Sequence, residues 1–482
     1  MSDSLKKQAF KGVGWSAVEK LSIQGIQFVL QIILARLLLP SDYGIIAMLA
    51  IFIQISSVFI DSGFANALIQ KQNCTERDYT TVFYYNLVVS FFVYVVLFFI
   101  APLVAAFYEI DLLTSVMRVA SLVVILNAFT IVQRTILVKQ INFKSQTVVS
   151  FSSAVLSGLG GIALAYTGFG VWALCAQSLL NSFLQIFFFF YYVRWLPTLT
   201  FSKESFNELF GFGSKILVAS IISTIYNNLY TIVIGKRFNS KELGHYSRAE
   251  NFAFFPSSMI GSIISRVSYP VLSKIQNDDD KLKEAYRQII RYSSFIIFPI
   301  MIGLSSLARP FIITILGARW EGCCQMLQIL CFALMWDHLC SLNLNLLYVK
   351  GKTNLVLRLE IIKKLIAILI LIVSIPFGII VMCWGRVLNN LVAFYLNTYY
   401  TKTLVGLSFW QQLHDVLPYF VQSMVMGIMI FIVNTLMHDL YFAQLLLGTI
   451  VGILIYAALS LFFLRDMKTE LLSILSNYKS IK

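Results

Sequence analysis

The sequence is poor in charged side chains, and this shortage excludes a water-soluble protein. Only 12% of its 482 residues are Asp, Glu, Lys or Arg, whereas a soluble globular domain carries about 25%. Hydrophobic residues make up 58%, compared with about 45–50% in soluble domains. A soluble fold of this length has no means of hiding so much apolar surface. The natural unit of the chain is therefore the stretch of ~20 apolar residues that crosses about 30 Å of hydrocarbon.

Motifs for catalysis, nucleotide binding and metal binding are also missing. The sequence contains no GxxxxGK[ST] and no GxGxxG, so we expect no bound nucleotide and no other cofactor. The seven cysteines form no CxxC pair and the four histidines are far apart, which argues against a metal site. The longest polar segments, at about 194–210 and 272–290, are too short for a catalytic domain. We therefore predict that the protein is not an enzyme, and that any energy comes from an ion gradient, the substrate's own gradient or a partner protein.

Apolar stretches recur along the whole chain. We predict about fourteen transmembrane helices, at approximately 13–37, 43–68, 80–105, 114–137, 147–167, 170–193, 211–235, 246–271, 290–316, 323–348, 355–375, 377–400, 414–436 and 441–464. Lys and Arg gather in alternate loops when the N-terminus is placed in the cytoplasm, as the positive-inside rule requires. The net charge of +14 fits this distribution, and without a continuous basic stripe we expect no nucleic-acid partner. The sequence thus predicts an all-α, multi-pass protein of the bacterial inner (plasma) membrane with both termini in the cytoplasm.

Two segments about 200 residues apart are similar, which indicates an internal repeat. Gly12-Val-Gly14 opens the first predicted span and Gly211-Phe-Gly213 opens the seventh. Each span leads to a basic residue and then to a polar turn, Pro40-Ser-Asp-Tyr-Gly44 in one copy and Ser240-Lys-Glu-Leu-Gly244 in the other. Because six spans separate the copies, both have the same orientation, as in a parallel repeat about a pseudo-two-fold axis along the membrane normal. We expect a six-helix lobe at 1–200, a second six-helix lobe at 201–404, and two additional helices with a cytoplasmic tail at 405–482.

Several predicted spans contain ionisable side chains, which should face a wet cavity or a partner. Each such group costs at least about 2.5–3.5 kcal/mol at the centre of an isolated helix. Cations outnumber anions in this set, and a positive chamber in low dielectric attracts an anion such as phosphate or pyrophosphate. The cationic candidates for substrate binding are Lys20, Arg134, Lys215, Arg248, Arg266 and Lys363, and the acidic candidates for ion coupling are Glu19, Asp61 and Glu250.

Structural roles stay open for several of these residues. Arg134 and Arg266 can lie within a turn or two of an interface and simply reach it with their side chains. Glu250 can pair with Arg248 or with a cation on another helix. Asp337 and the adjacent histidine either relay protons or form a satisfied polar pair.

The second predicted span is unusually polar. Spacings of three and four residues place Gln54, Ser57 and Asp61 on one helical face. Such a face either lines a cavity and hydrogen-bonds sugar hydroxyls, or holds a neighbouring helix. The sequence favours neither interpretation.

Short segments in a fixed order resemble one family of exporters. They are Leu39-Pro-Ser-Asp-Tyr-Gly44, Asp61-Ser-Gly-Phe64 followed by Ala67-Leu-Ile-Gln70, and Gly244-His-Tyr-Ser-Arg-Ala249 followed by Pro256 and Arg266-Val-Ser-Tyr-Pro270. Together they resemble the Wzx-type polysaccharide flippases of the multidrug/oligosaccharidyl-lipid/polysaccharide (MOP) exporter superfamily, in the branch that handles colanic acid and teichuronic acid. The resemblance covers nearly the whole chain, although no single motif is diagnostic.

The resemblance implies a MATE-like fold of two six-helix lobes with two extra C-terminal helices. It also implies a function: transport of undecaprenyl-pyrophosphate-linked oligosaccharide from the cytoplasmic to the periplasmic leaflet by alternating access, for O-antigen, capsule or exopolysaccharide biosynthesis. In the family, cations in the cavity would bind the pyrophosphate. The resemblance gives this role to four candidates in the sequence, Lys20, Lys215, Arg248 and Arg266. The family's coupling acid has no secure match in this sequence. The implied partners are the lipid-linked substrate, the bilayer, a polysaccharide polymerase, a chain-length regulator, and Na⁺ or H⁺ as coupling ion.

Two other functions compete with this hypothesis. A cation-coupled drug or metabolite exporter on the same fold needs an acidic, aromatic-lined cavity, which the excess of intramembrane Lys and Arg disfavours. A membrane polymerase or glycosyltransferase needs a large periplasmic loop or a sugar-nucleotide domain, and the sequence contains neither.

Overall fold

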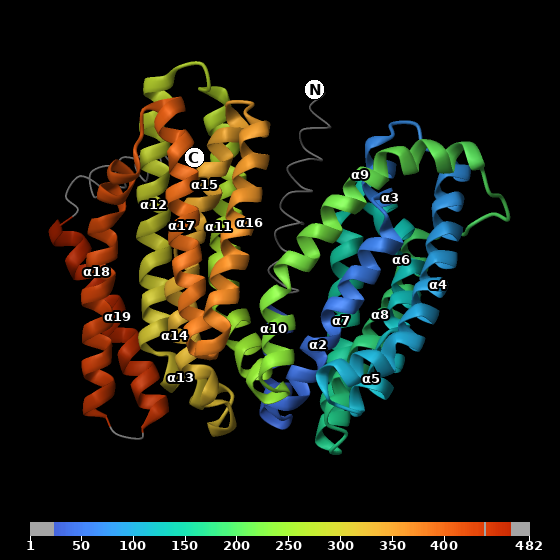
Figure 1. Cartoon of the computed structure of the whole chain (residues 1–482), viewed down its shortest axis with the longest axis horizontal. Helices are drawn as coiled ribbons and strands as arrows, with labels where there is room; N and C mark the ends of the chain where they lie inside the picture. Colours follow the sequence, from blue (N-terminus) through green and yellow to red (C-terminus); the bar gives the residue numbers. More distant parts are fainter. Residues whose placement is uncertain (1–23, 438–439, 464–482) are drawn as a thin grey trace. The chain divides into compact units, whose positions relative to one another are not determined.

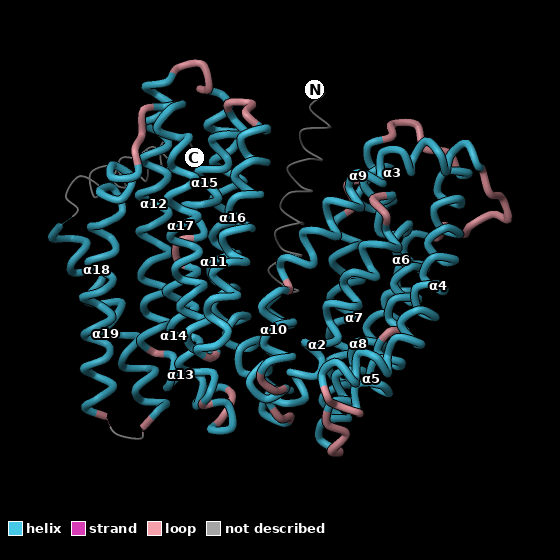
Figure 2. The backbone as a smooth tube through the Cα atoms, viewed as in Figure 1, coloured by secondary structure: helices cyan, strands magenta, loops and turns pink. Residues whose placement is uncertain are grey.

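The computed structural model describes residues 24–437 and 440–463, and all regular structure in these ranges is helical (Figure 2). Ten helical stretches there are long and apolar enough to cross a membrane. An eleventh candidate, Lys203–Asn227, is bent by 49° between Gly211 and Gly213. The chain is therefore an all-α, multi-pass membrane protein, as predicted.

The chain forms two compact units, Met1–Gly244 and His245–Lys482. After the helical segment Gln24–Leu37, the first unit contains α2 (Pro40–Asp61), α3 (Phe64–Gln70), α4 (Glu76–Tyr108), α5 (Leu112–Ala120), α6 (Leu122–Lys139), α7 (Phe143–Tyr166), α8 (Val171–Val193), α9 (Lys203–Asn227) and α10 (Leu229–Arg237) (Figure 1). The lobe boundaries expected at residues 200 and 404 were drawn between copies of the repeat. The division into compact units does not test them, so they stay a prediction.

The second unit begins within α11 and ends with two long helices. Its helices are α11 (Ser240–Lys274), α12 (Asp279–Ser306), α13 (Ala308–Ile315), α14 (Gly322–Leu334), α15 (Asp337–Val349), α16 (Thr353–Ser374), α17 (Ile379–Val405), α18 (Phe409–Leu436) and α19 (Tyr441–Phe463). α14 is the most enclosed of them, since Cys323, Leu327, Leu330 and Cys331 are all fully buried. The cysteines therefore serve as small apolar core residues.

Eleven of the fourteen predicted spans coincide with the apolar helices and the bent α9. The other three, at 13–37, 246–271 and 355–375, correspond to Gln24–Leu37, α11 and α16. The described part of the first is short, and α11 and α16 carry several charged residues, so none qualifies by apolarity alone. The count of fourteen membrane crossings stays a prediction.

α4 shows how the sequence produces a membrane helix. Thr75 caps its start by accepting a hydrogen bond from the Asp78 backbone N–H, while a carboxylate oxygen of Asp78 accepts one from the Thr75 backbone N–H at 2.9 Å. Farther along, Val88, Phe99 and Leu103 are about 70% exposed. An exposed apolar face of this length is unfavourable in water and is the surface expected of a helix in contact with lipid.

The two polar turns that indicated the repeat each begin a helix, α2 at Pro40 and α11 at Ser240. They also touch. A Cβ atom on Gly44 would lie 1.7 Å from the carbonyl oxygen of Ser240, and a Cβ atom on Gly244 would lie 1.8 Å from the carbonyl oxygen of Pro40. The fifth residue of each turn therefore lies against the first residue of the other turn, so the contact is reciprocal. The earlier glycine pair of the repeat, Gly12 and Gly14, lies outside the described residues.

Candidate functional site

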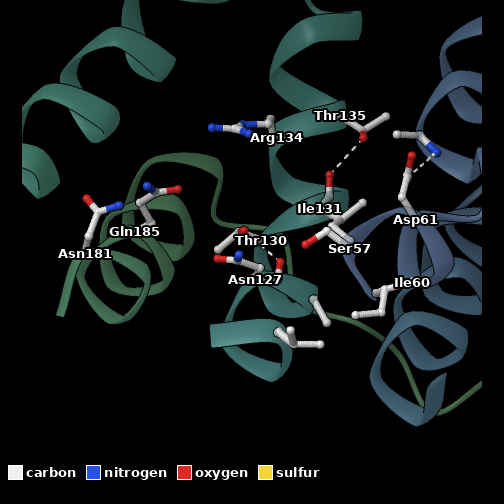
Figure 3. Close-up of a pocket in the computed structure, with 13 residues that line it drawn as sticks. Ser57, Ile60, Asp61, Asn127, Thr130, Ile131, Arg134, Thr135, Asn181 and Gln185 are labelled. Carbon is white, nitrogen blue, oxygen red and sulfur yellow. Dashed lines mark hydrogen bonds between the residues drawn. The ribbon is translucent and has the colours of Figure 1, made fainter. Parts of the chain in front are cut away.

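A polar cavity of about 440 Å³ lies inside the first unit, between α2, α6 and α8 (Figure 3). Its volume falls within the range of about 300–1,000 Å³ that is usual for small-molecule sites. The polar side chains that line it are Ser57, Asp61, Asn127, Thr130, Arg134, Thr135, Asn181 and Gln185. One carboxylate, one guanidinium and six uncharged polar groups thus share a single space inside the first unit.

The end of α2 places Asp61 at this cavity. The helix stops because Ser62 and Gly63 adopt left-handed backbone conformations, with φ of 44° and 75°. The chain then re-enters a helix at α3, and Oδ1 of Asp61 accepts a hydrogen bond from the Ala65 backbone N–H at 3.1 Å. Among the described residues no donor reaches Oδ2 of Asp61. The carboxylate is therefore positioned by the helix break and keeps one oxygen available to a ligand.

α6 supplies the floor of the cavity from one helical face. Asn127, Thr130, Ile131 and Arg134 follow spacings of three and four residues. The Asn127 side-chain oxygen accepts a hydrogen bond from Ser182 of α8 at 2.9 Å, which fixes α6 against α8. Figure 3 shows Arg134 extending from α6 toward the side of Asn181 and Gln185, away from Asp61. The positive and negative groups thus lie on opposite sides of α6.

One buried acceptor in the cavity wall lacks a hydrogen bond. The side-chain oxygen of Asn181 on α8 is buried and meets no donor in the described part of the chain. A buried polar atom without a partner costs about 1–3 kcal/mol, so a ligand that donates a hydrogen bond to it recovers that cost. The cavity therefore favours ligands rich in hydroxyl or amide groups.

The structure divides the polar face that was predicted on the second span. Ser57 and Asp61 line the cavity. Gln54 does not, because its side-chain oxygen accepts a hydrogen bond from the Asn228 amide, at the junction of α9 and α10, at 2.9 Å. Ser57 and Asp61 thus line a cavity and Gln54 holds a neighbouring segment, while hydrogen bonding to sugar hydroxyls stays a prediction.

In the second unit the candidate acid Glu250 is engaged by a cation on another helix. Arg386 of α17 lies 3.5 Å from Glu250 of α11, and each side chain is about one-quarter exposed. Lys363 forms an ion pair with Glu360 one turn earlier on α16. Arg386 and Lys363 are also close enough to interact electrostatically with Asp337, whose Oδ1 accepts a hydrogen bond from Asn390 at 2.8 Å. These residues form one charge network, in which both Arg386 and Lys363 have acidic neighbours.

Other candidates occupy different environments. Arg248 is only 8% exposed, on α11. Lys215 on α9 and Arg266 on α11 are exposed, and neither forms an ion pair with another described residue. Glu19 and Lys20 lie outside the described residues. The structure therefore places Arg134 and Asp61 at one cavity, on opposite sides of α6, whereas a positive chamber shared by all the cations stays a prediction.

His338, next to Asp337, has both ring nitrogens occupied. Nε2 lies 3.1 Å from the Ser294 hydroxyl and Nδ1 lies 2.7 Å from the Met335 carbonyl oxygen. The residue is almost fully buried. His338 and Asp337 are therefore each hydrogen-bonded to other described residues, His338 to Ser294 and Met335 and Asp337 to Asn390.

Residues 33–325 match the family model described as "Polysaccharide biosynthesis protein", and this match covers more than half of the chain. The chain belongs to this polysaccharide biosynthesis protein family. All residues that line the cavity lie within the matched segment. The Wzx-type resemblance seen in the sequence is confirmed by this membership and by the relatives.

Two bacterial proteins named for polysaccharide biosynthesis are similar to most of the chain. The chain is 24% identical over 434 residues to "Teichuronic acid biosynthesis protein TuaB" of Bacillus subtilis (strain 168), covering 89% of both proteins. It is 24% identical over 448 residues to "Lipopolysaccharide biosynthesis protein WzxC" of Escherichia coli (strain K12), again with 89% of each covered. Among solved structures, lipid II flippase MurJ in an inward closed conformation superimposes with a TM-score of 0.76 at 16% identity, covering 94% of this chain and 99% of MurJ. This polysaccharide biosynthesis protein therefore has a MurJ-like fold.

Five uncharged cavity residues were not predicted as site residues: Asn127, Thr130, Thr135, Asn181 and Gln185. Isolated amides and hydroxyls are common in membrane helices as contacts between helices, so their presence in a span does not distinguish a cavity. The spacing of Asn127, Thr130 and Arg134 on one face of α6 was the only available signal. The pairing of α6 with α8 is a tertiary feature that periodicity does not contain.

Proposed function

We propose that this protein is a flippase that moves lipid-linked oligosaccharide repeat units from the cytoplasmic to the periplasmic leaflet of the bacterial inner membrane, by alternating access. The observation that carries the proposal is the polar cavity inside a unit whose outer helices expose apolar faces. Membership of the polysaccharide biosynthesis family and the fold shared with a lipid II flippase support it. The product would be a surface polysaccharide such as O-antigen, capsule or exopolysaccharide.

The chemistry of the cavity suits the sugar part of such a substrate. Amide and hydroxyl side chains from α6 and α8 can exchange hydrogen bonds with sugar hydroxyls, and Arg134 can bind an acidic substituent. Buried polar groups that are left unpaired by an ill-fitting ligand are costly, so the same groups provide selectivity. The polyprenyl chain would stay in the bilayer while the sugars occupy the polar space.

The pyrophosphate would be met by cations that no described carboxylate neutralises. Lys215 and Arg266 fit this role better than Lys363, which already pairs with Glu360. Arg248 and Lys20 stay candidates from the family resemblance. This assignment rests on charge and exposure, since phosphate oxygens form strong hydrogen bonds with available Lys and Arg donors.

For coupling to Na⁺ or H⁺, Asp61 is the better candidate of the two described acids. It faces the cavity with one carboxylate oxygen available, whereas Glu250 is paired with Arg386. Glu19 stays a candidate by sequence. A polysaccharide polymerase and a chain-length regulator would act on the translocated product, and both termini of the flippase would be cytoplasmic.

The proposal is tested by deleting the gene and extracting lipid-linked oligosaccharides together with surface polysaccharide. We expect loss of the polymer and accumulation of undecaprenyl-pyrophosphate oligosaccharide. Complementation with Asn181→Ala/Gln185→Ala should restore little polymer, and the control Thr449→Ala, at an exposed hydroxyl of α19, should restore it fully. An intact polymer without lipid-linked build-up, accompanied by altered drug susceptibility, would favour the drug or metabolite exporter instead.

A further inference from the structure

Two arginines of α12 share one carboxylate of α18. Arg287 donates from Nε to Oδ2 of Asp415 at 2.7 Å and from Nη2 to Oδ1 at 2.8 Å. Arg291 donates from Nη2 to Oδ1 of the same residue at 2.6 Å. The side chain of Asp415 is fully buried, whereas those of Arg287 and Arg291 are 36% and 42% exposed. The carboxylate therefore faces the protein and the guanidiniums face outward.

The cluster carries more positive than negative charge. A guanidinium has five N–H donors, and each arginine uses those on Nε and Nη2 for Asp415. Lys283 precedes Arg287 by one helical turn, so the three cations form a row with a rise of about 6 Å between neighbours. Glu284 is the other carboxylate that acts on Arg287. The row Lys283, Arg287 and Arg291, called here the α12 basic row, thus exceeds Asp415 and Glu284 by one charge.

The neighbouring side chains place this row near the membrane–water boundary. Asp415 is six residues into α18, which corresponds to about 9 Å along the helix. Trp410, near the start of α18, is 74% exposed, and tryptophan favours the interface. Beyond Asp415, Leu417, Val421 and Ile428 are exposed apolar residues on the same helix. Cationic groups are therefore followed by an apolar surface, in the order of a lipid's headgroup and acyl chains.

A purely structural role does not account for the second arginine. One guanidinium held by two hydrogen bonds already neutralises Asp415. The second guanidinium adds positive charge at the membrane–water boundary, where the approach of an anion stabilises it. Since both guanidiniums are open to the outside of the protein, that anion can come from the bilayer.

We infer that the α12 basic row binds the headgroup of an anionic phospholipid. The phosphodiester accepts hydrogen bonds from the outward N–H groups of Arg287 and Arg291, with Lys283 supplying additional charge. The acyl chains extend from this headgroup into the bilayer. Asp415 holds the two guanidiniums side by side, so that a single phosphodiester can contact both. This site is independent of the cavity in the first unit and of the proposed flippase activity.

The test is native mass spectrometry of the purified full-length protein in detergent, with equimolar phosphatidylglycerol and phosphatidylcholine of matched chains. We expect the wild type to retain phosphatidylglycerol at least about fivefold over phosphatidylcholine, as one surface cation near an anionic lipid provides. Lys283→Gln/Arg291→Gln leaves Arg287 on Asp415 and should bring the ratio to about one. The control Lys281→Gln/Arg309→Gln removes two exposed cations that pair with Asp278 and Glu321, and should keep the wild-type ratio.

Three results would overturn the inference. The first is equal retention of the two lipids by the wild type, and the second is an unchanged preference in Lys283→Gln/Arg291→Gln. If that variant does not fold, Lys283→Gln alone, which forms no ion pair with a described carboxylate, should reduce the preference by at least half, and an unchanged ratio counts against the site. The third is a rise in thermal midpoint with inorganic phosphate that matches the rise with phosphatidylglycerol, because the site would then take free phosphate.

Discussion

Glu250 and Arg386 form an ion pair between α11 and α17, with 3.5 Å between Oε1 and Nη2. The sequence left two roles open for Glu250, ion coupling and a link to a cation on another helix. The observed pair satisfies the second role without any transported ion. Each role predicts a different outcome when the pair is dismantled.

We expect Glu250→Gln and Arg386→Gln each to lower the free energy of unfolding, since each removes the ion pair between two partly buried side chains. The double variant should lose less than the sum of the two, with a coupling energy of about 0.5–3 kcal/mol in a double-mutant cycle. The measurement is reversible unfolding of the purified protein in detergent. Purely additive losses, with transport abolished by Glu250→Gln alone, would instead support ion coupling at Glu250.

Asp61→Asn should remove the negative charge of the cavity and keep the hydrogen bond that holds the helix break. The amide oxygen can still accept the hydrogen bond from the Ala65 backbone, so the helix break should persist and stability should change by less than about 1 kcal/mol. Transport of lipid-linked substrate into proteoliposomes should lose its response to an imposed Na⁺ or H⁺ gradient. Ser57→Ala, on the same face, is the control that should keep that response. An unchanged gradient response in Asp61→Asn would exclude Asp61 from coupling.

Lys215 and Arg248 should respond differently to truncation although both are proposed to meet the pyrophosphate. Lys215→Ala removes an exposed side chain without an ion pair among the described residues, so its thermal midpoint should stay near that of the wild type while surface polysaccharide falls. Arg248→Ala removes an almost fully buried side chain and should lower the midpoint by several degrees. Normal polysaccharide levels in Lys215→Ala would remove Lys215 from the proposed site.

Asp415→Ala should be more destabilising than either single arginine variant beside it. Loss of the shared carboxylate leaves two neighbouring guanidiniums that repel each other, whereas Arg291→Gln leaves the Arg287–Asp415 pair intact. Breaking a buried pair from one side costs about 3–5 kcal/mol, and we expect a value near that for Asp415→Ala. Thermal unfolding of the three variants gives the order. Equal losses of stability in Asp415→Ala and in the two single arginine variants would mean that the Arg287–Asp415 pair alone does not stabilise the contact between α12 and α18.

Gly44→Ala and Gly244→Ala should both prevent normal folding. Each added methyl group would overlap a backbone carbonyl, at 1.7 Å and 1.8 Å, which is too close for any rotamer to relieve. Size-exclusion chromatography of fluorescent fusions should show loss of the monodisperse peak. Gly261→Ala, where nothing lies within 4 Å of the new atom, is the matched control inside the same α11 helix. A normal peak for Gly44→Ala would show that α2 and α11 can separate without loss of the fold.

The positions of most membrane helices were predictable because a long apolar run has few alternatives to a spanning helix. Their ends were less predictable. The ninth span was expected at 290–316, but α12 begins at Asp279, where Asp278 caps it by accepting a hydrogen bond from the Lys281 backbone N–H. Hydropathy detects only the part of a helix inside hydrocarbon, so a charged extension into water escapes it. The same span also ends early, at Ser306, and continues as the separate helix α13.

The charged side chains of the cavity could be predicted from the sequence, whereas its uncharged polar side chains could not. Asp61 and Arg134 were noticed because ionisable groups are rare in spans. Asn181 and Gln185 were not, since amides are compatible with ordinary helix contacts. The partner of Glu250 lies more than 130 residues away in sequence, so that pairing follows from how α11 and α17 pack and not from any local pattern.

The reciprocal approach of Gly44 to Ser240 and of Gly244 to Pro40 has an implication for the protein's ancestry. A contact in which position x of one copy meets position y of the other, and y meets x, is the signature of two identical subunits arranged about a two-fold axis. A single-copy ancestor of about 200 residues, inserted twice in the same orientation, would have formed this contact with itself as a homodimer. After a gene fusion these two glycines would have been held fixed, because neither can acquire a side chain while the other helix stays in place.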